Sequence, residues 1–276
     1  MITHYTYTNS SGKSISFGEG ERYSIIEITG TSGVTAEISR NAAPNADGTV
    51  VSNIRIEERP ITILAEAEDH SLMDHVLTVF GPKKDGVLYA GSTFINCNVD
   101  QILPSRKLFG RTFFVSMIAT YPYFSGNELI TKQIISWSNN WTFPFMLPGE
   151  RTFIFGARDD SGSVEVVNEG HVECPITLTI RFTGTVINPL IKIRETGQFM
   201  LFNATFLAGD MVEVDTFHKR KSVRLNGSRN FSILGDGSEF FWLPQGLSTV
   251  EYSADSGSMS MEVDISYRNY YLSEVE

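Results

Sequence analysis

Two stretches of strict alternation between apolar and polar residues constrain what this chain can fold into. Residues 176–182 read Ile-Thr-Leu-Thr-Ile-Arg-Phe, and residues 259–267 read Met-Ser-Met-Glu-Val-Asp-Ile-Ser-Tyr. A period of two residues is typical of a β-strand with one buried face and one solvated face. A shorter alternation places Val212 and Val214 on one face. Because such strands must bury their apolar faces against one another, we expect an antiparallel β-sandwich in this half of the chain.

Turn-forming residues separate the predicted strands. Asn188-Pro189 cannot continue as a central strand, while Asn226-Gly227 and Asp236-Gly237 are typical of tight turns. In the first half, short apolar runs bounded by glycine or proline predict further strands, among them residues 22–30 and 54–66. The fold class is therefore predicted to be mainly β.

One short helix is predicted in the first half. Ser71, followed three residues later by Asp74, is a variant of the capping box, in which Ser71 accepts from the first-turn amides. Apolar residues then recur at i, i+4 and i+8 from Leu72 to Phe80, which places them on one helix face. Gly81-Pro82 ends the helix.

Length and composition divide the chain into two domains. The 276 residues suffice for two domains of roughly 100–200 residues each. We expect an N-terminal domain of residues 1–126, an aromatic connector of residues 127–150 and a C-terminal domain of residues 151–276. The first eighteen residues are polar and are expected to form an arm or an edge strand. For Trp137 and Trp141 in the connector, packing is favoured over a docking role.

The charge balance and the cysteines exclude several classes of protein. The formal net charge of −10 argues against a protein that grips nucleic-acid phosphates. Cys97 and Cys174 are far apart in sequence and have no metal-ligand spacing, so buried free thiols are expected. The first residues lack the pattern of a signal peptide, and no apolar run approaches the roughly 20 residues of a membrane helix. We expect synthesis in a cytoplasm and no membrane association.

No motif of catalysis, metal binding or cofactor binding stands out. A polar cluster at residues 66–75 holds four acidic residues with His70 and His75, but a strand end followed by a capped helix explains it. Residues 159–163 begin like a calcium loop, yet lack its alternating acidic spacing, so a solvated turn is favoured. Glycine-rich phosphate loops and nucleophile elbows are absent. We therefore expect no enzyme, no cofactor and no metal.

A basic run stands out in this acidic chain. It consists of Lys219, Arg220 and Lys221, preceded by His218. At a β-turn such a run is most often a solvated tip. The sharper alternative is an ion-paired contact with an acidic face of a partner or of a neighbouring copy.

An ordered set of motifs then spans nearly the whole chain. In the first half the set comprises Gly30, Asp47-Gly48, Arg59-x-Ile61-Thr62, Phe80-Gly81-Pro82, Leu88-Tyr89 and Tyr121-Pro122-Tyr123-Phe124. In the second half it comprises Asn168-x-Gly170, Pro175 and its strand, Asn188-Pro189-x-Ile191, Gly209 to Thr216, Asn226-Gly227 and Leu243-Pro244. With these motifs the chain resembles the distal tail proteins of siphovirus-type phages, the siphovirus tail component family.

This resemblance implies an architecture and a role. It implies an N-terminal domain that forms a hexameric ring, and a C-terminal β-sandwich of galectin-like topology. Such proteins are structural components of the virion of a phage or prophage. They join the tail tube to the tip or baseplate that carries receptor-binding proteins, and DNA passes through the lumen.

Sheet-rich domains leave unpaired strand edges, and a closed ring of copies buries them. We expect these contacts at the N-terminal arm and around Arg59.

Two other functions compete with this structural role in the phage tail. A carbohydrate-binding module for host attachment would require an exposed aromatic residue such as Trp242 with polar groups around it. A galectin-like fold by itself does not imply sugar binding. A hydrolase of cell-wall polymer is least favoured, because the motif searches failed.

Overall fold

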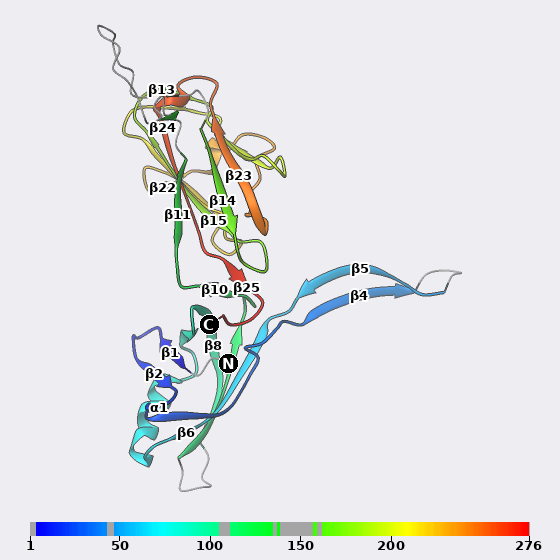
Figure 1. Ribbon diagram of the computed structural model, residues 1–276, viewed down its shortest axis with the longest axis vertical. Coiled ribbons are helices and arrows are strands. Elements are labelled where there is room, and N and C mark those ends of the chain that lie inside the picture. The colour runs from blue at the N-terminus through cyan, green and yellow to red at the C-terminus, as the bar shows by residue number, and fades with distance from the viewer. Residues whose placement is uncertain are drawn as a thin grey trace, which may run out of the picture. The chain divides into compact units, whose positions relative to one another are not determined.

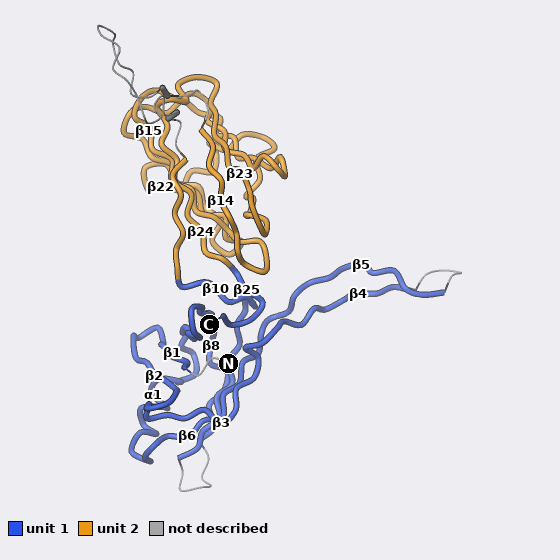
Figure 2. The backbone as a smooth tube through the Cα atoms, in the orientation of Figure 1, with its two compact units in different colours: residues 1–127, 270–276 blue, residues 128–269 orange. Residues whose placement is uncertain are grey.

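The computed structural model describes residues 4–42, 47–104, 111–134, 137–138, 157–158 and 162–275. The chain divides into two compact units (Figure 2): unit 1 holds residues 1–127 together with 270–276, and unit 2 holds residues 128–269. Both units are built from antiparallel strands (Figure 1), and the described residues include one short α-helix. The prediction of a mainly β protein with β-rich domains is confirmed.

Unit 1 contains one large antiparallel sheet. Its strands run in the order β2-β1-β7-β8-β9-β6-β3, and β10 pairs with both β8 and β25. Their bounds are β1 (Tyr5–Asn9), β2 (Ser14–Phe17), β3 (Tyr23–Thr29), β6 (Arg59–Ala67), β7 (Asp85–Ala90), β8 (Thr93–Pro104), β9 (Thr112–Ala119), β10 (Phe124–Gly126) and β25 (Tyr270–Tyr271). Strands β4 (Ala36–Ala42) and β5 (Thr49–Ile56) form a separate hairpin.

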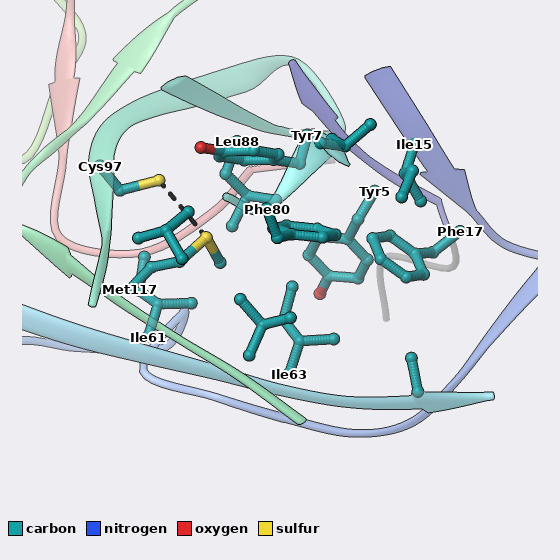
Figure 3. Close-up of a cluster of buried hydrophobic side chains, with 14 of the residues drawn as sticks. Tyr5, Tyr7, Ile15, Phe17, Ile61, Ile63, Phe80, Leu88, Cys97 and Met117 are labelled. Carbon is teal, nitrogen blue, oxygen red and sulfur yellow. Dashed lines mark hydrogen bonds between the residues drawn. The ribbon is translucent and has the colours of Figure 1, made fainter. Parts of the chain in front are cut away.

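The core of unit 1 is aromatic (Figure 3). The rings of Tyr7 and Phe80 stack with their centroids 4.6 Å apart. Phe17 and Phe113 pack around Phe80. β1 lies between β2 and β7 in the sheet and buries every second side chain. The prediction of an N-terminal arm is therefore wrong for β1. Its polar residues are the alternate, outward-facing positions of a central strand, and β2 alone of this pair lies at the sheet edge.

The predicted helix is present, but its cap differs from the prediction. A 3₁₀ turn (His70–Leu72) precedes α1 (Met73–Val79), and the carboxylate of Asp69 accepts from the amide of Ser71 at 2.7 Å. The N-cap residue of α1 itself, Leu72, makes no side-chain capping hydrogen bond. The 3₁₀ turn lies before the helix and moves the capping position upstream. The capping residue is therefore Asp69 and not Ser71. Val76 and Phe80 are fully buried, as their spacing predicts.

Unit 2 is a sandwich of two antiparallel sheets. One sheet has the order β11-β24-β15-β20-β21-β22, and the other has the order β14-β23-β17-β18. The bounds of the first are β11 (Ile130–Ile134), β24 (Met261–Tyr267), β15 (Ile176–Phe182), β20 (Met211–Asp215), β21 (Ser222–Leu225) and β22 (Ser228–Arg229). Those of the second are β14 (Gly162–Asn168), β23 (Gly246–Ser253), β17 (Leu190–Ile193) and β18 (Phe199–Leu201). Two-stranded pairs, β12 (Trp137–Ser138) with β13 (Ala157–Arg158) and β16 (Val186–Ile187) with β19 (Thr205–Phe206), complete the unit.

The alternating stretches form the centre of this sandwich. The four apolar residues of β15 are buried, and so are Val212 and Val214 of β20. Tyr267 of β24 donates its hydroxyl hydrogen to the carbonyl of Val167 in β14 at 3.0 Å, which links the two sheets. β24 begins at Met261, so the predicted strand is two residues too long; Met259 lies in a 3₁₀ turn and is exposed. Asn226 and Gly227 both have positive φ, as the hairpin prediction requires.

The predicted domain boundaries need two corrections. Residues 128–134, assigned to the connector, belong to unit 2, where β11 pairs with β24. Residues 270–275, assigned to the C-terminal domain, belong to unit 1, where β25 pairs with β10; we call them the return segment. Both differences arise because strand pairing between segments far apart in sequence leaves no local signal. Trp141, the side chain of Trp137 and residues 159–161 of the turn predicted at residues 159–163 lie outside the described residues.

Candidate functional site

The hairpin of β4 and β5 is the most exposed element of unit 1. It continues the ribbon formed by β3 and β6 and extends away from the sheet of its unit (Figure 1). Every residue of β4 and all but the last residue of β5 are exposed. Among the described strands, β4 and β5 pair only with each other. An isolated two-stranded hairpin is marginally stable in water, so this element is expected to be covered in the working protein.

One face of the hairpin is apolar near its base. Ile38 lies opposite Ile54, and Ala36 lies opposite Ile56, so these four side chains share a face. Ile54 remains 60% exposed. The opposite face carries Glu37 and Arg55, which form an ion pair at 2.7 Å.

Beyond a bulge at Ser39 and Arg40, Val50 and Val51 are also exposed. Burying one such aliphatic side chain contributes about 1.5–3 kcal/mol. Since consecutive residues of a strand point to opposite faces, these two valines lie on different faces of the hairpin. Taken together, the exposed apolar side chains of the hairpin are enough to drive an association.

A hollow of about 710 Å³ runs along the edge strand β3. Ile25, Ile26 and Ile28 contribute its apolar lining, and Glu27 and Glu274 add carboxylates. β3 is the last strand of the sheet, so one edge of its backbone has no strand beside it among the described residues. An edge strand with apolar side chains is a surface for pairing with another chain.

Arg59, predicted as an assembly contact, is only 4% exposed and is engaged within unit 1. Its Nη1 donates to the carbonyls of Gly30 and Thr31, both at 3.1 Å, and its Nη2 donates to the carbonyl of Leu272 at 2.6 Å. Its guanidinium also lies 5.0 Å from the centre of the Phe124 ring. The side chain therefore presents no charge to a partner of this chain.

Burial lowers the pKa of Arg59 to about 10, so the guanidinium stays charged at neutral pH. This burial has no signal in the sequence, because arginine side chains are mostly exposed.

The basic run lies at an exposed turn of unit 2, between β20 and β21. Arg220 pairs with Asp215 at 3.6 Å and covers the ring of Phe217, while Lys221 lies over the ring of Phe240. Burial, Lys219 and Lys221 lower the pKa of His218. The turn is thus a positively charged surface with aromatic rings beneath it.

Trp242, the residue considered for a sugar site, is half-buried. Its indole N–H donates to the carbonyl of Thr216 at 2.9 Å, and the His218 ring lies 6.0 Å from it. The indole N–H is therefore already hydrogen-bonded within unit 2.

The described residues contain no group of three or more His, Cys, Asp or Glu side chains placed to hold a metal ion. His75 contacts the carbonyl of Ser14 at 3.1 Å, which ties α1 to β2. Cys97 and Cys174 are buried free thiols, and burial raises the pKa of each to about 12, so neither is a ready nucleophile. In the part of the chain described by the structure, no helix has the length and apolar character needed to cross a bilayer.

Comparison with known proteins gives one match to the C-terminal part of the chain and one to nearly its whole length. Residues 169–271 match the family model of the siphovirus-type tail component, C-terminal domain. The crystal structure of the SPP1 Dit protein, described as a paradigm of the hub adsorption apparatus in phages that infect Gram-positive bacteria, is similar over 97% of this chain and 99% of that chain. The TM-score is 0.69 at 13% identity, which establishes a shared fold. No curated protein sequence matches the chain.

A structure of the phage P2 baseplate in its activated conformation with Ca is also similar, over 98% of each chain. Its TM-score is 0.49 and its identity 9%. At that level the likeness supports no argument about this chain.

Proposed function

Since residues 169–271 match the siphovirus-type tail component model and the fold of the chain is that of the SPP1 Dit protein, we propose that the chain is a tail component of this kind. In this proposal it forms a ring-shaped hub in the virion, hexameric in the expected case, that joins the tail tube to the host-adsorption apparatus. It is a structural part of the tail tip or baseplate and makes or breaks no bond. DNA passes through the lumen of the ring without being held, which agrees with a net charge of −10.

The observation that supports assembly is the uncovered apolar face of the β4–β5 hairpin. The occupant we propose for this face is a second copy of the chain, at the hollow along β3. That hollow has an apolar lining of isoleucines and an unpaired strand edge, which complement the face around Ile38 and Ile54. A hairpin on one side that meets a different surface on the next copy is a heterologous contact, and such contacts form a ring when the rotation between successive copies closes.

Light scattering coupled to size-exclusion chromatography tests this proposal. Each chain has a mass of 30.8 kDa, so six copies give 6 × 30.8, about 185 kDa. We expect a discrete species of that size at micromolar concentration. A particle that stays at the monomer mass up to the highest soluble concentration would reject the ring.

The turn of Lys219, Arg220 and Lys221 is the surface that we propose for an acidic adsorption protein. Arg220 over the ring of Phe217 combines two residue types that are enriched at protein interfaces. Titration calorimetry with the purified neighbouring tail proteins should show binding to the ring that weakens with salt and is lost on reversal of the three charges. Unchanged affinity in that variant would remove this turn from the interface.

A carbohydrate-binding module is less well supported. Trp242 is half-buried and its N–H is already paired, so little of the ring and no free donor remain for a sugar.

A further inference from the structure

The ribbon of β3 and β6 bends where it becomes the β4–β5 hairpin. The bend comprises residues 30–35 on one strand and 57–58 on the other. Gly30 has φ of +83°, and a Cβ there would lie 2.0 Å from the carbonyl oxygen of Pro60. The two strands therefore cross so closely at the bend that no other residue fits position 30. A hollow of about 230 Å³ opens beside this crossing.

Arg59 joins this bend to a distant part of the sequence. Two of its hydrogen bonds go to carbonyls of the bend, at Gly30 and Thr31, and the third goes to Leu272 in the return segment. A buried guanidinium is costly unless several acceptors surround it, and a well-packed apolar residue often serves stability equally well. What an arginine adds here, and an apolar residue lacks, is a planar fork of donors that holds three carbonyls at fixed relative positions.

The return segment is itself fixed to the sheet by contacts that do not involve Arg59. The amide of Glu274 donates to the carbonyl of Thr31 at 3.3 Å, and the hydroxyl of Tyr5 donates to the Glu274 carboxylate at 3.2 Å. Val275 accepts from the amide of Ser92 at 2.9 Å. These hydrogen bonds hold the return segment against both the sheet and the bend.

We propose that Arg59 and the return segment form a clamp that holds the β4–β5 hairpin at the angle required for seating on the next copy. A hairpin free to swing would lose that freedom on binding, and the clamp removes this cost in advance. Residues 270–275 are made after unit 2, so the hairpin is fixed only after unit 2 has been synthesised. This inference rests on the proposed ring and names the residues that control its formation.

Two full-chain variants test the clamp from its two sides. Arg59→Met removes the three charge-assisted bonds at similar length, and Tyr5→Phe removes one hydroxyl that steadies the return segment and leaves Arg59 intact. Arg22→Met is the matched control, because Arg22 is exposed and lies 4.0 Å from Glu68 at the surface. Spin labels are placed by Ser52→Cys in the hairpin and Asn96→Cys in β8. Both native cysteines are buried.

The distance distribution between the labels is measured on monomer, below the assembly concentration, and ring formation is measured by mass photometry. We expect a narrow distribution for the starting protein and for Arg22→Met. Arg59→Met should broaden it and raise the concentration for half-assembly at least tenfold, and Tyr5→Phe should do the same to a smaller degree.

Equally narrow distributions and equal assembly in all variants would overturn the clamp while leaving the ring intact. The converse result, broadening in Arg59→Met with no ring from the starting protein, would support the clamp and reject the proposed function. If Arg59→Met fails to fold, Tyr5→Phe carries the test, because loss of one hydroxyl leaves the core packing unchanged.

Discussion

Two antiparallel ribbons in this molecule have the same local pattern and opposite surroundings. In the β4–β5 hairpin, Ile38 lies opposite Ile54 and both are exposed; in the β15–β24 ribbon of unit 2, Leu178 lies opposite Ile265 and both are fully buried. Cross-strand pairing is a local property, whereas burial depends on whether a second layer lies beneath. The sandwich supplies that layer within the chain. For the hairpin, we propose that another copy supplies it.

The largest expected effect is on assembly. Ile54→Asp would place a carboxylate in the proposed contact, and burying an unpaired charge costs several kcal/mol. We expect the concentration for half-assembly to rise at least 100-fold, while the monomer unfolds at nearly the same temperature because the residue is exposed in the chain alone. Mass photometry and calorimetry on the same samples measure both.

Val167→Asp is the control for that experiment. Val167 is 43% exposed on the sandwich and has no role in the proposed contact. If both substitutions dissolve the ring equally, or if neither does, the hairpin is not the contact.

The next effect is on the stability of unit 2. Leu178→Ala removes a fully buried side chain and should lower the free energy of unfolding of unit 2 by about 2–5 kcal/mol. All three tryptophans of the chain lie at positions 137, 141 and 242, within unit 2, so tryptophan fluorescence in urea reports this unit. A midpoint unchanged from the parent protein would contradict the burial.

Alkaline pH should weaken both units. Burial raises the pKa of Cys97 in unit 1 and of Cys174 in unit 2 to about 12, above the ordinary thiol value. Between about pH 9 and 12 the unfolded chain loses these protons first, so stability falls by up to about 1.4 kcal/mol per pH unit for each thiol. For unit 2, the difference between the urea midpoints at pH 8 and pH 10 should be smaller in Cys174→Ala than in the parent protein. An identical pH dependence in that variant would exclude the thiol.

The smallest effect is expected from surface ion pairs. Arg55→Met in the hairpin and Arg181→Met in the sandwich each remove an exposed pair, with Glu37 and Asp264 respectively. Such pairs contribute about 0–1 kcal/mol. Both variants should unfold within a few degrees of the parent in low salt, as followed by circular dichroism. A larger fall in unfolding temperature in Arg55→Met than in Arg181→Met would show that the polar face of the hairpin stabilises unit 1 by more than this ion pair.

Alternation predicted much of the sandwich but little of unit 1. β15 and β24 alternate strictly, so their buried residues can be read directly from the sequence. β1 alternates as well, but Tyr with Thr, and the polar partners suggested an exposed arm although Tyr7 is fully buried. The alternation shows only which side chains share a face. Which of the two faces is buried depends on what packs against the sheet, and the alternation does not contain that information.

The candidate site was the least predictable part. Arg59 was singled out, yet its role depends on carbonyls of Gly30 and Leu272, which are 29 and 213 residues away in sequence. Backbone acceptors leave no residue-type signal. The apolar hairpin was detectable as strands, but its lack of a covering layer was not. The basic turn is exposed, which a run of charges at a tight turn predicts without reference to any distant contact.

The pairing of β10 with β25 has a consequence for how this chain can diversify. Phe124 lies opposite Tyr271, so the point where the polypeptide leaves unit 1 and the point where it re-enters are neighbours on adjacent strands. Residues 128–269 are therefore an insertion within an otherwise continuous unit, and domain insertions are tolerated where the two ends are close. A different module, or a short loop, can occupy that socket and leave the strand ladder on either side unbroken.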